Sequence, residues 1–248
     1  MSISELIVEC SLLERGCREE AAAMTHAAAL GLPVTLASRR QVRAIALTAS
    51  TLCVGSISFL RAALEGRGGL PRHEPYPDPL GKYLHRKTGY SRSLSALVRE
   101  REMPVFVKPA EGWKRFTGAV LDHEGAARER GISPHQAFFW SSPVTWLSEW
   151  RAYCVHGVVL DLQPVPTTSV KSPCVDRDVV GEAAARHYAE VGASGVVLDF
   201  GVLESGETAL IEANDGFSFG AYGAVAPATL WAVWSARWPQ LFENRRIS

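Results

Sequence analysis

The stretch from Gly195 to Ala213 constrains the fold most, because it reads as two apolar strands joined by a tight turn. Residues Gly195–Leu203 and Thr208–Ala213 are rich in apolar and β-branched side chains, and Ser205-Gly206 stands between them. Apolar runs separated by a short glycine-containing turn are typical of a β-hairpin. We therefore expect an antiparallel hairpin at this place.

Short strands and helices alternate irregularly along the rest of the chain. Three glycines and four prolines cluster between Gly66 and Pro79, which indicates a loop and a domain boundary. The hairpins are not repeated βαβ units, so we predict an α+β chain. The expected elements are helices over 5–30, Leu94–Glu100, Asp178–Val191 and Pro227–Trp238, strands at Val34–Leu36, Arg43–Thr48, Val105–Val107, Phe116–Leu121 and Gln136–Trp140, a strand running into a helix over Val54–Ala63, and a second hairpin of Trp150–Val155 and Gly157–Leu162.

Composition and charge exclude several classes of partner. Lysine plus arginine and aspartate plus glutamate both number 26, so no overall field steers the chain toward nucleic acid or an anionic membrane. The five cysteines show no CxxC spacing, which argues against a zinc site or a disulfide framework. The N-terminus has no basic region of the signal-peptide kind, and polar residues interrupt the longest apolar stretch. We expect a cytoplasmic protein without a membrane span.

Three oxygen-bearing side chains converge on the Gly195–Ala213 hairpin and its extension. Glu212 and Asn214 lie two residues apart and so face the same side of a strand, and Asp199 lies opposite them if the hairpin is tight. Oxygen ligands of this kind suit Mg²⁺ or Mn²⁺ better than zinc. The alternative is that these residues only alternate outward from a half-buried strand.

A lysine leaves the end of another apolar strand. Lys108 follows Val105-Phe106-Val107 directly, and a lysine in such a place is suited to nucleotide phosphates. Lys114 and Arg115 lie in or beside the next turn, where they would close over phosphates or substrate from a flap. They would equally suit a solvated turn.

A third polar pattern lies on the strand that begins the other hairpin. Glu149 and Arg151 are two residues apart and share a face. Glu149 would accept hydrogen bonds from ribose hydroxyls and Arg151 would hold a phosphate or carboxylate. The alternative is a mutual surface ion pair, which contributes little to stability. Just upstream, Ser142-Pro143-Val144 forms a connecting segment that offers backbone groups to an adenine edge.

Taken together, these patterns resemble the ATP-grasp superfamily, and within it the clade named for two arginines and one lysine. The resembling stretches are VGSISFLRAAL at 54–64, FVKPAEGWKRFTG at 106–118, SEWRAYCVHG at 148–157 and LIEANDGFSFGAYG at 210–223. They span about two-thirds of the chain. The flap differs from the glycine-rich flap of better-known ATP-grasp ligases, because AEGWKRFTG holds only Gly112 and Gly118.

The resemblance implies an ATP-grasp fold, in which two α+β subdomains with antiparallel sheets grip ATP. A short N-terminal α/β region at 1–75 would precede an ATP-grasp domain at 76–248, with lobes at 76–144 and 145–248. The resemblance further implies these roles: Lys108 contacts phosphates, Ser142–Val144 form the adenine hinge, Glu149 contacts ribose, Arg151 faces the phosphate and acyl region, and Asp199, Glu212 and Asn214 bind magnesium.

The chemistry implied by the resemblance is ATP-dependent ligation. A carboxylate and ATP would give an acyl phosphate, which an amine then attacks, and Lys108 and Arg151 with the metal ions would stabilise the developing charge. We expect small-molecule or peptide carboxylate and amine substrates, with ATP and Mg²⁺ (or Mn²⁺) as cofactors. The side chains expected on the substrate side are Arg115, Lys171, Phe217 and Ser218.

Two other functions remain open at this level. One is a kinase-like phosphotransferase of the same fold, and the other is a non-catalytic nucleotide-binding module. Trp231, Trp234 and Trp238 form a stripe on the expected C-terminal helix, which would pack in the core, in a homodimer or against a partner. Asp215 is expected to be a turn residue, with an amine base as the alternative.

Overall fold

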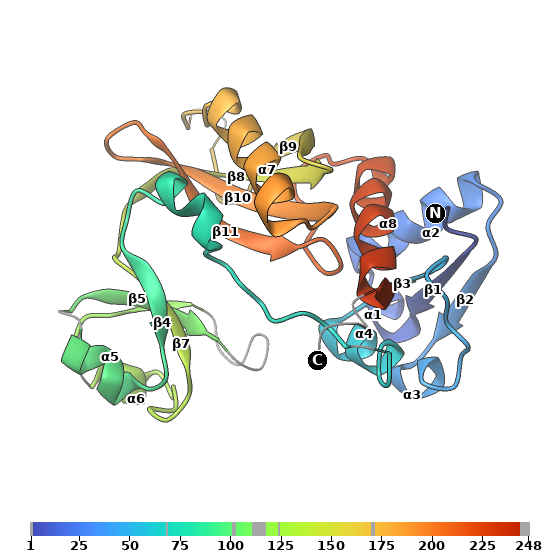
Figure 1. Ribbon diagram of the computed structural model, residues 1–248, viewed down its shortest axis with the longest axis horizontal. Coiled ribbons are helices and arrows are strands. Elements are labelled where there is room, and N and C mark those ends of the chain that lie inside the picture. Colours follow the sequence, from blue (N-terminus) through green and yellow to red (C-terminus); the bar gives the residue numbers. More distant parts are fainter. Residues whose placement is uncertain are drawn as a thin grey trace.

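Three β-sheets organise the computed structural model, which describes residues 2–67, 69–100, 103–110, 118–123, 125–169 and 172–243. One three-stranded sheet is parallel, and two four-stranded sheets are antiparallel. Figure 1 places the parallel sheet at the right, the sheet built from β4 to β7 at the lower left, and the sheet built from β8 to β11 above it. The class is α+β, as the sequence predicts.

The N-terminal sheet has the order β2-β1-β3, with β1 at Glu5–Glu9, β2 at Val34–Ala37 and β3 at Thr51–Val54. The central strand β1 pairs in parallel on both sides, and its Leu6-Ile7-Val8 run is fully buried. Parallel strands are typically covered on both faces and therefore read as continuous apolar runs. The surrounding helices are α1 (Cys10–Glu14), α2 (Arg18–Ala29), α3 (Arg39–Val42) and α4 (Ile57–Ala63).

Two local predictions for this region are wrong. The helix expected over 5–30 is a strand followed by two helices, because the run Leu6-Ile7-Val8 forms the sheet centre. The strand expected at Arg43–Thr48 is absent from that described stretch, which follows α3 as turn and irregular backbone. The expected strand running into a helix over Val54–Ala63 is confirmed, since β3 ends at Val54 and Ser56 caps α4 by accepting a hydrogen bond from the amide of Phe59 at 3.3 Å.

The first antiparallel sheet has the order β4-β7-β5-β6. Its two faces differ because side chains alternate along each strand. Val105 and Val107 face a core that includes Leu97, whereas Lys108 lies on the opposite face. The bounds are β4 Thr88–Ser91, β5 Val105–Pro109, β6 Ala119–Leu121, β7 Phe138–Ser141, α5 Leu94–Glu100 and α6 Ala126–Glu129.

The second antiparallel sheet has the order β11-β10-β8-β9 and contains both expected hairpins. Helix α7 covers one face of it, beginning after the cap residue Asp176 and ending at Gly192, whose φ of 79° suits glycine. The bounds are β8 Trp146–Val155, β9 Val158–Pro164, β10 Gly195–Leu203, β11 Thr208–Asp215 and α7 Arg177–Val191, and a 3₁₀ helix η1 at Asp78–Tyr83 precedes β4.

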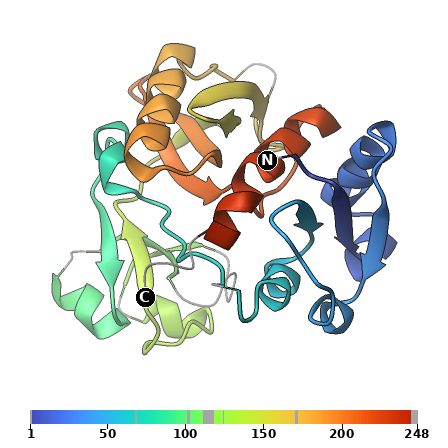
Figure 2. The same cartoon turned by 45° about the vertical axis from the view of Figure 1, so that its right-hand side comes forward.

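Helix α8 at Pro227–Glu243 joins the second sheet to the N-terminal region, as Figure 2 shows. It contacts α2 and β3 on one side and β8 and β10 on the other. Trp231, Trp234 and Trp238 are buried in this shared core, which confirms core packing and removes the stripe as a partner surface. Within the described residues, no helix is both long enough and apolar enough to cross a membrane.

Candidate functional site

The hairpin of β10 and β11 brings the expected oxygen-bearing side chains together. Asp199 pairs directly with Glu212 across the two strands. The Asn214 amide donates to Asp199 Oδ2 at 3.1 Å and to Glu212 Oε1 at 3.2 Å. The three side chains therefore form one hydrogen-bonded patch on the face of the sheet away from α7, as the alternation of the sequence predicts.

Arg151 of β8 completes this patch from the other side of β10. It lies opposite Asp199 in the strand register and holds that carboxylate with two bonds, Nε to Oδ1 and Nη2 to Oδ2, each 2.7 Å long. Both side chains are buried. Bidentate pairs of this kind fix orientation as well as charge. Arg151 thus pairs with Asp199, and the alternative of an ion pair with Glu149 is not what the structure shows.

Lys108 reaches the same patch from the first sheet. Its ammonium group forms an ion pair with Glu212 and lies 4.6 Å from the centre of the Tyr76 ring. Burial favours the neutral form of Glu212, but Lys108, with smaller effects of Asn214 and His73, outweighs it and the pKa of the carboxyl is lowered. Lys108 and Glu212 therefore face each other across the two sheets, with opposite charges.

Glu149 and the segment 142–144 lie where the sequence analysis places them. Glu149 is half-buried two residues before Arg151 on β8, and burial, followed by Asp199 and Glu212, raises its pKa. Ser142, Pro143 and Val144 connect β7 to β8 and thus the first sheet to the second, and the Ser142 amide donates to the carbonyl of Lys87 at 2.8 Å.

The loop after β11 forms a further wall of the patch. Tyr222 lies over the Arg151 guanidinium at 4.1 Å, and Arg151 Nη1 donates to the Gly220 carbonyl at 3.0 Å. Helix α2 holds this loop, because the Ala221 amide donates to Glu19 at 2.6 Å and Arg18 donates to the Gly223 carbonyl at 2.8 Å. The N-terminal region therefore fixes the surroundings of Arg151.

The remaining expected residues have different outcomes. Lys114, Arg115 and Lys171 lie outside the described residues. Phe217 is buried in the core shared with α8, and Ser218 is half-buried. Asp215 is neither a free turn residue nor a free base, because Arg237 of α8 binds it bidentately at 2.7 and 2.8 Å.

Three further residues lie near the patch that no sequence pattern singles out. Arg86 donates to the carbonyls of Leu210 and Ile211 at 2.6 and 2.7 Å, beside the Glu212 strand position. Tyr76 and His73 lie on the linker, the stretch 69–77 that leads into η1, and burial, together with Lys108, lowers the pKa of His73 to about 4. Neither a short motif nor a periodic pattern marks these residues, and a loop rich in glycine and proline gave no reason to select them.

The donor set fits a magnesium ion with incomplete protein coordination. Asp199, Glu212 and Asn214 offer two carboxylates and one amide oxygen after rotation of the amide. Within the part of the chain that the structure describes, no three His, Cys, Asp or Glu side chains gather as a metal site. Magnesium usually takes only one or two carboxylates and keeps positions for water and phosphate. Two carboxylates and one amide oxygen therefore suit magnesium better than they suit zinc or calcium.

Comparison with known families identifies a match over residues 83–230. The matching family model is the ATP-grasp domain, family 2 of the clade named for two arginines and one lysine. The matched range covers more than half of the chain and includes Lys108, Glu149, Arg151, Asp199, Glu212 and Asn214. No curated protein sequence matches significantly.

Solved structures share the fold at low sequence identity. The ATP-grasp ligase PsnB in complex with a minimal precursor has a TM-score of 0.55 at 13% identity, over 94% of this chain and 99% of that one. N5-carboxyaminoimidazole synthetase from Staphylococcus aureus has a TM-score of 0.61 at 8% identity, over 96% and 78%. A RimK domain ATP-grasp protein from Sphaerobacter thermophilus has a TM-score of 0.57 at 14% identity, over 96% and 98%.

Proposed function

Because the chain belongs to the ATP-grasp domain family, family 2 of the clade named for two arginines and one lysine, we propose that it is an ATP- and Mg²⁺-dependent carboxylate–amine ligase. Members of this superfamily are ATP-dependent ligases, and a PsnB complex contains Mg and ADP. The proposed product is an amide, formed through an acyl phosphate of a small-molecule or peptide carboxylate.

The observation that carries the proposal is the charge arrangement between the two antiparallel sheets. Lys108 of the first sheet and Arg151 of the second are both held by carboxylates, Glu212 and Asp199 respectively. Lys108 is suited to exchange Glu212 for a polyphosphate, and Arg151 adds positive charge from its fixed place against Asp199. In the proposed enzyme, Lys108 and Arg151 stabilise the charge of the transferring phosphoryl group.

The nucleotide would lie between the sheets. Backbone groups of Ser142, Pro143 and Val144 would contact the adenine, Glu149 would accept from the ribose, and Lys108 and Lys114 would bind phosphates. In this proposal residues 1–75 form the N-terminal region, 76–144 the first lobe and 145–248 the second lobe. The connecting position of 142–144, between β7 and β8, supports its role as a hinge.

Asp199, Glu212 and Asn214 would hold the metal in this proposal. When bound, Mg²⁺ supplies positive charge to the phosphates and helps to orient them. Glu212 is ionised in the folded protein because Lys108 lowers its pKa, and an ionised carboxylate is the form that binds a hard cation.

The proposed reaction has two displacements. A carboxylate oxygen of the substrate attacks the γ-phosphorus of ATP and ADP leaves, which gives the acyl phosphate. The neutral amine then attacks the carbonyl carbon, phosphate leaves and the nitrogen loses a proton. In this proposal Ser218, Arg115 and Lys171 contact the substrate on the acyl side. Phe217 is left out because it is buried in the core.

Calorimetric titration of Mg-ATP tests the proposal. We expect magnesium-dependent binding to the wild type and a loss of at least about tenfold in affinity for Lys108→Ala, since one charge-assisted phosphate contact contributes roughly 1.5–3 kcal/mol. Lys82→Ala is the matched control, because Lys82 is an exposed lysine paired with Glu182 at 2.5 Å. Unchanged binding by Lys108→Ala would contradict the assignment.

Product analysis separates ligation from the other two functions. A screen of acids with and without amines, followed by mass spectrometry, should find ADP, phosphate and an amide together. A phosphorylated product without ligation would indicate the kinase-like enzyme. Tight Mg-ATP binding with no turnover for any acid would favour the nucleotide-binding module.

A further inference from the structure

The strand β11 contains one residue more than the stretch of β10 that it faces. Phe200 pairs with Leu210 and Asp199 pairs with Glu212, so Ile211 has no residue opposite it. An extra residue of this kind is a β-bulge, and bulges beside active sites re-aim side chains. This bulge directly precedes Glu212, one of the three residues of the polar patch.

The bulge decides which face of the sheet carries Glu212 and Asn214. Leu210 packs in the core that α7 covers, and residues two and four positions further along a regular strand share its face. Without the extra residue, Glu212 and Asn214 would therefore lie on the α7 face with Leu210. Because Ile211 shifts the register by one, they lie instead on the face of Asp199, to which Asn214 donates.

Arg86 holds the bulge from outside the sheet. Its Nη1 donates to the Leu210 carbonyl at 2.6 Å, and its Nη2 donates to the Ile211 carbonyl at 2.7 Å. Consecutive carbonyls of a regular strand point to opposite edges, so two that meet one guanidinium are a feature of the bulge. A planar guanidinium offers its donors in a fixed fork, which matches two neighbouring oxygens.

Two aromatic rings and a third carbonyl fix the Arg86 side chain. The Tyr76 and Trp146 rings have their centres 5.6 and 5.3 Å from the guanidinium carbon. Nη1 also donates to the Leu84 carbonyl at 3.0 Å. The guanidinium is therefore directed at backbone oxygens of its own chain.

The position of Arg86 in the chain links the bulge to the connections between the two antiparallel sheets. Arg86 lies between η1 and β4, where the chain enters the first sheet. Where the chain leaves that sheet, the Ser142 amide donates to the carbonyl of Lys87, the neighbour of Arg86, at 2.8 Å. Both connections between the sheets therefore meet beside the residue that holds the bulge.

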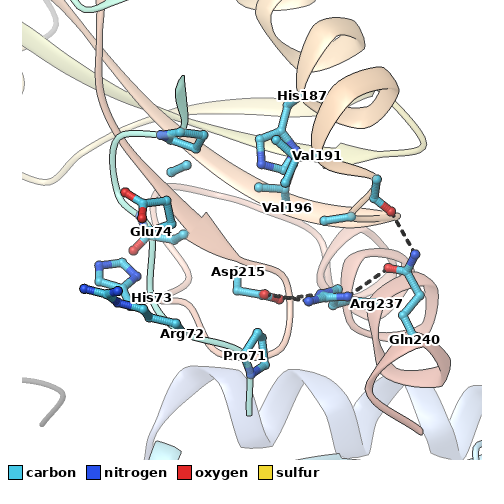
Figure 3. A pocket seen from close by; sticks show the side chains of 15 residues that line it. Pro71, Arg72, His73, Glu74, His187, Val191, Val196, Asp215, Arg237 and Gln240 are labelled. Carbon is cyan, nitrogen blue, oxygen red and sulfur yellow. Dashed lines mark hydrogen bonds and ion pairs between the residues drawn. The ribbon is translucent and has the colours of Figure 1, made fainter. Parts of the chain in front are cut away.

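β11 is the edge strand of its sheet, so contacts of this kind take the place of a neighbouring strand. The linker supports the same edge, because the Ala213 amide donates to the Pro75 carbonyl at 3.0 Å. Figure 3 shows linker residues 71–74 across a pocket from Asp215 at the end of β11. Arg86 holds the part of this edge that directly precedes Glu212.

We propose that Arg86 is a positioning residue for the metal site. By binding the two bulge carbonyls, it holds the register that presents Glu212 and Asn214 beside Asp199. The inference rests on the proposed function, because that function assigns the metal to these three side chains. In this role Arg86 acts through the backbone of β11 and contacts neither the metal nor the nucleotide.

The test is calorimetric titration of a non-hydrolysable ATP analogue into the full chain, once with Mg²⁺ and once with EDTA. The dissociation constant in EDTA divided by that in Mg²⁺ measures the contribution of the metal. Arg86→Ala should lower this ratio at least about tenfold, since loss of a group that orients metal ligands typically weakens metal binding about 10–100-fold. Binding in EDTA should not change.

Two further variants complete the series. Arg86→Lys keeps the charge but loses the fork, so its ratio should lie between those of the wild type and Arg86→Ala. Arg92→Ala is the matched control, because Arg92 is an exposed arginine directly after β4, and its ratio should equal that of the wild type.

The direction of the effect separates positioning from two other roles. If Arg86 acted only as a nearby charge, its removal would strengthen Mg²⁺ binding and raise the ratio. If it contacted the phosphates directly, Arg86→Ala would weaken binding equally in Mg²⁺ and in EDTA. Either result, or an unchanged ratio, would overturn the inference.

Hydrogen exchange of the nucleotide-free protein tests the inference independently of the proposed function. Peptides that cover β11 should exchange faster in Arg86→Ala than in the wild type, while those that cover β1 should not change. Unchanged exchange in β11, or equal acceleration in β1, would overturn the inference. Failure of the wild type to bind nucleotide, with β11 loosened in Arg86→Ala, would instead refute the proposed function and leave the hold of Arg86 on β11 intact.

Discussion

The two antiparallel sheets contribute unequally to the candidate site. The second sheet supplies Arg151, Asp199, Glu212 and Asn214 from three adjacent strands, while the first sheet supplies Lys108. The second sheet also shares a core with the N-terminal region through α8, whereas one face of the first sheet packs on α5 and α6 in a core of its own and Phe139 on its other face joins the core of the second sheet. One half of the site is therefore anchored on both sides, and the other is carried by a sheet with a partly separate core.

This difference separates two kinds of ion pair. Arg151–Asp199 lies within one sheet, is bidentate and is buried, so it is part of the fold of that sheet. Lys108–Glu212 crosses between the sheets, so on the proposed division into two lobes its partners would part when one lobe moves. We infer that the anchored sheet fixes the geometry of the site and that the first lobe closes on the ligand.

The largest effect is expected from breaking the pair within the anchored sheet. Asp199→Asn leaves the buried Arg151 without its carboxylate, and loss of one partner of a buried ion pair costs about 3–5 kcal/mol. Urea unfolding should show this loss in the free energy of unfolding. Glu182→Gln, which breaks the exposed pair with Lys82, is the control and should change stability little. Equal effects of the two variants would mean that the Arg151 pair is not structural.

The sequence allows the hairpin and its polar face to be predicted because both follow from alternation along a strand. Asp199, Glu212 and Asn214 need a two-residue period, one tight turn and the extra residue Ile211 to meet, and only the last of these has no local signal. Glu149 and Arg151 share a face for the same reason. The strand β1 could not be separated from the following helices, because three apolar residues between two glutamates fit either period.

Other contacts depend on the tertiary fold and have no local signal. Arg86 meets carbonyls 124 and 125 residues away, and the linker residues Tyr76 and His73 reach the site only because the linker follows the edge of β11. The bond between Asp215 and Arg237 likewise requires α8 to pack beside the sheet. Such pairings are set by how the three sheets assemble, which a single sequence does not reveal.

A cavity created by mutation in the core of the first lobe tests whether that lobe unfolds independently of the second sheet. Leu97 is fully buried in the core of α5, β5 and β7, and Leu→Ala in such a place costs about 2–5 kcal/mol. Hydrogen exchange of Leu97→Ala should show faster exchange of the β5 and β7 amides and little change in β8 and β10. Equal loss of protection in both sheets would show that the lobes unfold together and would break the comparison.

Lowering the pH tests the stability of the anchored half of the molecule, because it contains the buried His187. The pKa of this residue is about 4 in the folded protein, against 6.5 for an ordinary histidine, chiefly because of burial. Between these values the unfolded chain binds a proton that the folded chain does not, so the free energy of unfolding falls as the pH drops from 6.5 to 4, by on the order of 3 kcal/mol. His187→Leu should lose less stability over this interval when both proteins are unfolded in urea at each pH. Parallel pH profiles would show that His187 is not the group responsible.

The smallest expected effect is the loss of stability when one helix cap is removed from each half of the molecule. Asp176 accepts from the amides of Asp178 and Val179 at 2.9 and 3.4 Å at the start of α7, and Ser93 accepts from the amide of Ala96 at 3.2 Å at the start of α5. Replacement of either by alanine removes about 1 kcal/mol of local stability. If the first lobe opens independently, Asp176→Ala should lower the global unfolding free energy by this amount, whereas Ser93→Ala should act mainly on hydrogen exchange in α5. A full loss in global unfolding for both variants would mean that the second sheet and the first lobe form one cooperative unit, and the closure inferred from the Lys108–Glu212 contact would then require the whole molecule to rearrange.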